Sequence, residues 1–201
     1  MLQLQNIPYI GDWKLRKIAK QVRAGQVPKG VDKDTVYEAL KLTAPKNGVE
    51  VFGFLSAIVE RVKGGEPEDL GLVSVKSVSL AFCEHLVDAM IGSSTVINDF
   101  NQHKMGSGSA AAATGDTALG AAMSGAQAAT GEAAATHGAT SIVYRSVGTV
   151  TATYNSDVEE HGIFNRSTGG VLLDRSIVTA ISVNTDDVIT WTYDLTVTTG
   201  G

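Results

Sequence analysis

The histidines are the side chains of this chain that titrate near neutral pH without help from their surroundings. His161 follows Glu159 and Glu160, and in a strand Glu159, but not Glu160, would share the face of His161. His103 and Asp99 would share a strand face in the same way. Neither spacing forms a catalytic or zinc-binding motif. We interpret both groups as structural or solvated.

The glycine-rich segments do not form a nucleophile or phosphate motif. Residues 106–108 have the sequence Gly-Ser-Gly, but the Lys-Ser/Thr pair of a P-loop does not follow. Ser107 and Ser124 lie beside glycines without the Gly-x-Ser-x-Gly frame of a nucleophile elbow. These segments are therefore predicted to be flexible turns.

The single cysteine, Cys83, excludes an internal disulfide and a Cys–His zinc site. It lies between Phe82 and Leu86 on a predicted helix, which predicts a buried core thiol. Since no catalytic, metal-binding or cofactor motif remains, the sequence predicts a protein that is not an enzyme and that uses no cofactor and no metal.

One predicted helix carries residues with the character of a binding surface. Its apolar positions recur at helical intervals from Trp13 to Val22, with Asp12 as the expected N-cap and Gly25 as the stop. The opposite face is basic. This face could bind an acidic protein surface, follow a phosphate backbone, or be solvated. Protein binding is favoured over nucleic acid because aromatic residues that would stack on bases are absent. The basic residues are Lys14, Arg16, Lys17, Lys20 and Arg23.

Charge and hydropathy limit the partners and the location expected for this chain, and charge differs between its two parts. The net charge is -5, so there is no overall basic field for a polyanion, and nucleic acid is an unlikely partner. Residues 1–70 contain 11 basic and 9 acidic residues, a balance of +2, so the remainder carries -7. The apolar stretches are too short to span a membrane, and the first residues lack the features of a signal peptide. We expect a soluble protein made in a cytoplasm.

Residues 1–66 are predicted to form a small helical module. The helix from Asp12 is followed by a second one, which Asp32 caps and Pro45 ends. A third helix is predicted over residues 49–62, between the glycines at positions 48 and 64. Residues 66–69 are an acidic linker.

Residues 70–201 are predicted to form an antiparallel β-sandwich. A strand over 70–78, a helix capped by Ser79 and ended by Gly92, and a strand over 96–105 precede a long Ala/Gly-rich loop at about 106–138. Alternating residues and turn signals then predict closely spaced strands, over 147–154, 158–164, 171–173, 177–183 and 189–197. The fold class is therefore α+β, with a helical module followed by a jelly-roll or Ig-like sandwich.

Charged side chains on these strands have structural interpretations. Asp157, Glu159, Glu160 and Asp174 are expected at sheet edges, where charge discourages uncontrolled pairing. Asp174 and Arg175 are candidates for a salt bridge at a strand end.

An ordered set of motifs in the C-terminal half resembles a domain of tailed-phage and prophage structural proteins. The motifs are Met105-Gly-Ser-Gly-Ser109, Thr114-Gly-Asp-Thr-Ala-Leu119, Glu160-His-Gly-Ile-Phe164, Thr168-Gly-Gly-Val-Leu-Leu-Asp-Arg175 and the closing Thr-rich strand. The resemblance covers roughly residues 95–201, and the Ala-rich segment 110–135 departs from the usual pattern.

The resemblance implies a bacteriophage virion protein, assembled in the host bacterial cytoplasm. We expect a capsid decoration or cement protein, a homotrimer that stabilises the head shell by contacting the major capsid protein or other virion proteins. The alternative is a neck, tail or fibre component that contacts the host. A third hypothesis is a carbohydrate-binding module in which Trp191 and Tyr193 would face the sugar, although core packing is favoured for both.

Overall fold

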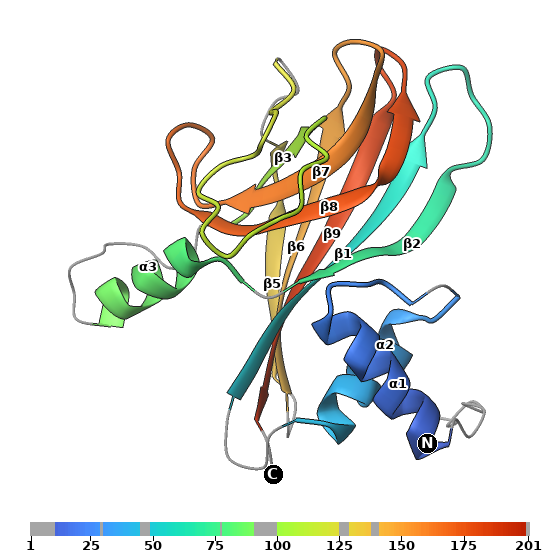
Figure 1. Cartoon of the computed structure of the whole chain (residues 1–201). Helices are drawn as coiled ribbons and strands as arrows, with labels where there is room; N and C mark the ends of the chain where they lie inside the picture. Colours follow the sequence, from blue (N-terminus) through green and yellow to red (C-terminus); the bar gives the residue numbers. More distant parts are fainter. Residues whose placement is uncertain are drawn as a thin grey trace.

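The computed structural model describes residues 11–28, 30–44, 49–76, 78–90, 100–124, 129–137 and 141–199, and it has an α+β fold. Two antiparallel sheets stack as a β-sandwich with helices at its sides (Figure 1), which confirms the predicted fold class. The helices are α1 (Asp12–Arg23), α2 (Lys33–Leu42) and α3 (Leu80–Met90). The strands are β1 (Val49–Glu60), β2 (Glu68–Lys76), β3 (Gln102–Gly106), β4 (Ala129–Thr130), β5 (Glu132–His137), β6 (Ser141–Thr151), β7 (Ser156–Phe164), β8 (Leu172–Val183) and β9 (Val188–Thr199).

Strand order places the last strand near the middle of the larger sheet. The five-stranded sheet has the order β2-β1-β9-β6-β5, and the four-stranded sheet has the order β4-β3-β7-β8. Strands β1 and β9 pair from Val49–Thr199 to Glu60–Val188, along their full lengths. Because β2 and β8 stand at ends of these two strand orders, both are edge strands.

The main core lies between the two sheets. Leu55, Trp191 and Tyr193 of the five-stranded sheet pack toward Met105 and Ile163 of the four-stranded sheet, and all of these side chains are buried. Alternation along β9 places its apolar residues on this inner face, as the sequence predicts.

Helices α1 and α2 cover the outer face of the larger sheet near β1 and β2 (Figure 1). Val22 of α1 and Val36 and Leu40 of α2 form a second, smaller core with Phe54 and Val75 of the sheet. The helical module is therefore packed onto the sandwich rather than tethered beside it.

The predicted third helix over residues 49–62 is wrong, because these residues form β1. Leu55 and Ala57 of β1 face the sandwich core, whereas Phe54 faces the helices, so both faces of the strand are buried. A strand buried on both faces has a continuous apolar run, and periodicity cannot distinguish such a run from a buried helix. The predicted boundary at residue 66 therefore does not separate helices from sheet.

Two further strand predictions are corrected. The C-terminal part of the predicted 106–138 loop contains β5, which pairs with β6 along its whole length. The two strands predicted over 171–173 and 177–183 are one continuous strand, β8. The other predicted strands are present with shifted bounds, and the predicted strand residues 96–99 lie outside the described residues.

The predicted helix caps are mostly confirmed. Asp32 accepts a hydrogen bond from the Thr35 backbone N–H at 2.8 Å, and Ser79 Oγ accepts one from the Phe82 N–H at 3.1 Å. Helix α1 differs, because Gly11 is its N-cap and Asp12 is already the first helical residue. Gly92 lies outside the described residues.

Candidate functional site

A buried carboxylate on β7 holds the loop that follows β3. Glu160 is fully buried, and its two oxygens accept backbone N–H groups from Gly108 at 3.1 Å, Gly120 at 2.9 Å and Ala121 at 2.7 Å. Burial would raise the pKa of Glu160, but these hydrogen bonds, together with Arg175, lower it. Glu160 is therefore ionised and anchors residues 107–124.

Arg175 on the neighbouring strand β8 completes the anchor. Its Nε donates to Glu160 at 2.7 Å, and its Nη1 donates to Asp116 at 3.0 Å. Asp116 also accepts the backbone N–H of Ala113 at 2.9 Å, and this bond, with Arg175, lowers the pKa of Asp116 against a smaller effect of burial. We call Glu160, Arg175 and Asp116 the loop clamp.

Glycines at three positions allow the loop to lie directly on the clamp and its strand. A Cβ at Gly108 would lie 2.6 Å from Glu160 Oε1, and a Cβ at Gly162 would lie 2.8 Å from a methyl group of Leu119. A Cβ at Gly106 would overlap both Glu160 and the Ala121 carbonyl. Any larger residue would push the loop away from the sheet.

The loop clamp unites the motifs that carry the phage-protein resemblance. Gly106 and Gly108, Asp116 and Leu119, Glu160 and Gly162, and Arg175 come from four separate motifs of the sequence and lie together here. Sequence reasoning grouped these residues by order along the chain and did not predict their contacts. The sequence carries little signal for the contacts, because Glu160 and Arg175 are only two of several charged residues on β7 and β8.

A second buried polar group lies between the sheets. His103 Nδ1 is 3.0 Å from His161 Nε2, and His103 Nε2 is 2.8 Å from Ser146 Oγ. Burial lowers the pKa of His103 to about 4, and burial together with His103 lowers that of His161 well below its usual value. Both imidazoles are neutral at physiological pH, and His161 lies against the Trp191 ring at 4.7 Å. Both side chains are almost completely buried, so neither is accessible to solvent in this structure.

Asp174 lies on the opposite face of β8 from the loop clamp. It is buried beside Tyr193, and a Cβ at Gly53 would overlap the Tyr193 hydroxyl and crowd the Asp174 carboxylate. Burial raises the pKa of Asp174 to about 7, and Lys76 and Ser176 oppose that shift only in part. The predicted Asp174–Arg175 salt bridge is therefore wrong, because neighbouring residues in a strand point to opposite faces.

A third charged group ties the helical module to the sheet. Asp194 of β9 accepts Arg145 Nε at 2.6 Å and Arg145 Nη2 at 2.9 Å, and it also pairs with Lys33 at the start of α2. Burial would raise the pKa of Asp194, but these partners lower it. The bond from Lys33 fixes α2 over the outer face of the larger sheet.

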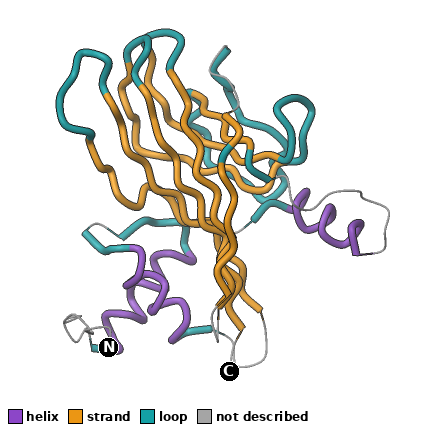
Figure 2. Tube along the Cα trace, turned by 180° about the vertical axis from the view of Figure 1, so that it is seen from behind, coloured by secondary structure: helices purple, strands orange, loops and turns teal. Residues whose placement is uncertain are grey.

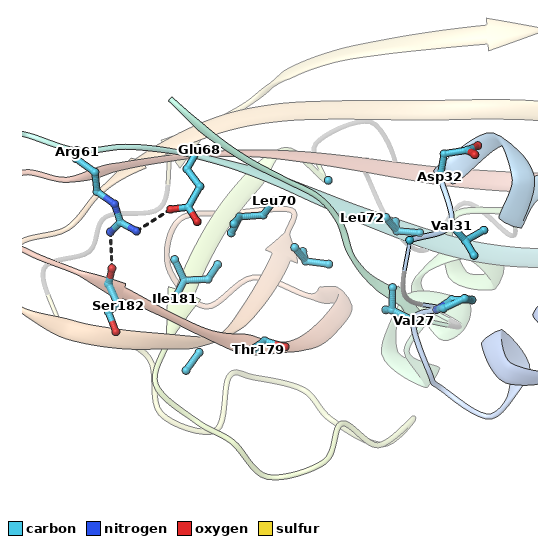
Figure 3. A pocket seen from close by; sticks show the side chains of 15 residues that line it. Val27, Val31, Asp32, Arg61, Glu68, Leu70, Leu72, Thr179, Ile181 and Ser182 are labelled. Carbon is cyan, nitrogen blue, oxygen red and sulfur yellow. Dashed lines mark hydrogen bonds and ion pairs between the residues drawn. The ribbon is translucent and has the colours of Figure 1, made fainter. Parts of the chain in front are cut away.

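A groove of about 630 Å³ lies between the edge strands β2 and β8 and the connection from α1 to α2 (Figure 3). Val31, Leu70, Leu72 and Ile181 give it apolar walls. At one end Arg61 pairs with Glu68 at 3.1 Å and also donates to the Ser182 carbonyl. The groove therefore combines apolar walls with a charged end.

The predicted basic face lies on exposed α1. Lys14, Arg16, Lys17 and Lys20 are exposed, and Trp13 in the same helix is 67% exposed. Arg23 differs, because it pairs with Glu50 at 2.8 Å and donates to Thr43. The structure therefore separates Arg23, which is part of the fold, from a surface made of the other four cations and Trp13.

The remaining predictions about single residues have mixed outcomes. Cys83 is exposed, because the helix that carries it buries only Phe82 against the sandwich. The edge prediction is wrong for Asp157, Glu159 and Glu160, because β7 lies between β3 and β8. Asp174 is on the edge strand β8, but it is buried, so its charge does not face a strand that could pair there. Trp191 and Tyr193 lie in the core, as favoured, so neither offers a surface to a sugar.

Two classes of site have no counterpart in the described part of the chain. There, no three His, Cys, Asp or Glu side chains gather closely enough to hold a metal ion, and Asp99 lies outside it. Within the same residues, no helix combines the length and apolar content needed to cross a membrane.

Compared with protein-family models, curated proteins and solved structures, the chain has no match.

Proposed function

We propose that this protein is a non-enzymatic structural component of a tailed-phage virion, and that it decorates and stabilises the capsid shell. The observation that carries the proposal is the loop clamp. Three buried or half-buried charged groups fix a surface loop whose own side chains are mostly Ala, Gly, Ser and Thr. Such a loop has few groups for catalysis but presents a defined backbone shape, which suits protein contact.

The expected partners are the major capsid protein and other virion proteins. The loop 107–124 and the basic face of α1 are separate exposed surfaces of one chain, so one copy can contact more than one neighbour. Contacts repeated by the symmetry of a shell add up even where each is weak. We expect a homotrimer, because closed symmetry is the rule for homo-oligomers and the resemblance implies three copies.

A neck, tail or fibre component is the second candidate. The helices α1 and α2 lie on one side of the sandwich, whereas the turns that join β1 to β2 and β8 to β9 lie at its far end (Figure 1). That polarity suits a protein anchored by its helices with its turns directed outward.

Copy number separates the two candidates. Quantitative mass spectrometry of purified particles would measure this protein relative to the major capsid protein. A ratio near one would support decoration of the shell, and a ratio far below one would move the protein to the neck or tail. Absence of the protein from washed particles would overturn the virion assignment.

A further inference from the structure

Helix α3 exposes an apolar stripe. Leu80 is 55% exposed, Val87 56% and Met90 78%, and Cys83 between them is also exposed. These residues follow each other at intervals of three, four and three, which is the spacing of a seam between two packed helices. Phe82, on the other face, holds the helix to the sandwich. The stripe is therefore separate from the face that the fold uses.

The charge of α3 complements that of α1. Helix α3 contains Glu84 and Asp88 and no Lys or Arg. Helix α1 exposes Trp13 together with Lys17 and Lys20, at positions i, i+4 and i+7 of one helix face. An acidic helix with exposed apolar residues and a basic helix with an exposed indole are complementary in charge, and both offer apolar surface.

The two helices lie on opposite sides of the sandwich, and the views from front and back agree (Figures 1 and 2). Within one chain they do not meet. Two surfaces that match each other but lie apart on one molecule can meet only between copies, and they then form a head-to-tail contact. We propose that α3 of one copy packs on the Trp13–Lys17–Lys20 face of α1 in a second copy.

Head-to-tail contacts form a ring when the rotation between copies closes and a filament when it does not. A single helix pair buries less area than stable dimers need, so one contact alone is weak. Closing a ring adds a further contact at high effective concentration, which makes the assembly concentration-dependent and cooperative. This inference stands independently of the virion assignment, since it concerns only pairs of this chain.

The test is a charge exchange in the full chain, measured by sedimentation velocity over a range of concentrations. The α3 variant combines Glu84→Lys with Val87→Lys, and the α1 variant combines Lys17→Glu with Lys20→Glu. Each variant alone should raise the dissociation constant roughly tenfold or more. The chain that carries all four changes should associate more tightly than either two-residue variant, because the new cations on α3 then face new carboxylates on α1.

The control is Lys63→Glu, an exposed charge reversal in the turn between β1 and β2. It should leave association unchanged, and circular dichroism should show the same fold in every variant. Tighter association in the chain with all four changes than in either two-residue variant supports the proposal. A chain that stays monomeric at all concentrations, or an association that the α3 and α1 variants do not weaken, would overturn it. The copy number in particles is a separate measurement, so the two proposals fail independently.

Discussion

The loop 107–124 and helix α3 lie next to each other on the sandwich, but they are held in different ways. The loop has little to bury and is fixed by three backbone hydrogen bonds to Glu160 and by Arg175 on Asp116. Helix α3 is regular and apolar, yet Phe82 is its one buried residue, and its large side chains Leu80, Val87 and Met90 are exposed. The Leu80 N–H donates to the Thr114 carbonyl at 2.8 Å and joins the two. Buried polar groups, rather than composition, therefore decide which segment is fixed.

The largest effect is expected from removing the carboxylate of Glu160, which holds the loop 107–124. Glu160→Ala leaves Arg175 buried without its main partner and three N–H groups without acceptors, so we expect a loss of about 3–5 kcal/mol in the free energy of unfolding. Urea denaturation measures the loss, and hydrogen exchange should show lower protection in residues 107–124. Glu159→Ala, at the neighbouring and less buried position, is the control. Unchanged exchange in the loop would contradict the assigned anchor.

The next largest effect is expected from removing the buried side chain of Phe82, which attaches α3 to the sandwich. Phe82 packs edge-on against Phe100 with ring centroids 5.3 Å apart, so Phe82→Ala should cost about 3 kcal/mol. Hydrogen exchange should then rise in α3, while the loop clamp keeps most of its protection. If the loop loses protection as much as the helix does, the two segments form one cooperative unit and the comparison fails.

Asp174 is a buried carboxylate that, unlike Glu160, has no strong partner. The pKa of Asp174 rises from 3.8 to about 7 on folding, so its contribution to stability is complete below pH 4 and is lost as the pH rises to 7. Asp174→Asn should therefore stabilise the protein at pH 8, by on the order of 2 kcal/mol, and have little effect at pH 4. Thermal unfolding at the two pH values measures the difference. Equal effects at both would show that Asp174 is not protonated in the fold.

The smallest effect should come from the exposed stripe of α3. Val87 is 56% exposed, so Val87→Gln should change the stability of the monomer by less than about 0.5 kcal/mol. Chemical denaturation at low protein concentration measures this. A large loss would mean that the stripe contributes to the fold of the single chain.

Local patterns allowed the sequence to predict the elements that depend on them. Strand β9 alternates cleanly because only one of its faces carries its large apolar residues, and Asp32 and Ser79 cap helices through bonds to residues three positions away. The sequence of β1 predicts a helix instead, because helices cover one face of this strand and the second sheet covers the other. Burial from both sides removes the alternation on which the prediction depends.

The contacts of the loop clamp could not be predicted, because they join residues far apart in the chain. Glu160 accepts from Gly120 across 40 positions, and Arg175 reaches Asp116 across 59. The motifs indicated which residues belong together, but not that a carboxylate would be buried. Apolar neighbours in the sequence predict a buried Cys83, but on a helix that buries one face they do not surround it in space.

The position of β9 has a consequence for synthesis. This strand lies between β1 and β6, and its residues leave the ribosome long after both of those neighbours have been made. Until then, β1 and β6 lack their shared partner, and folding waits for contacts of high sequence separation. A nascent chain stopped before residue 188 would therefore be a substrate for chaperones and proteases rather than a folding intermediate with a closed core.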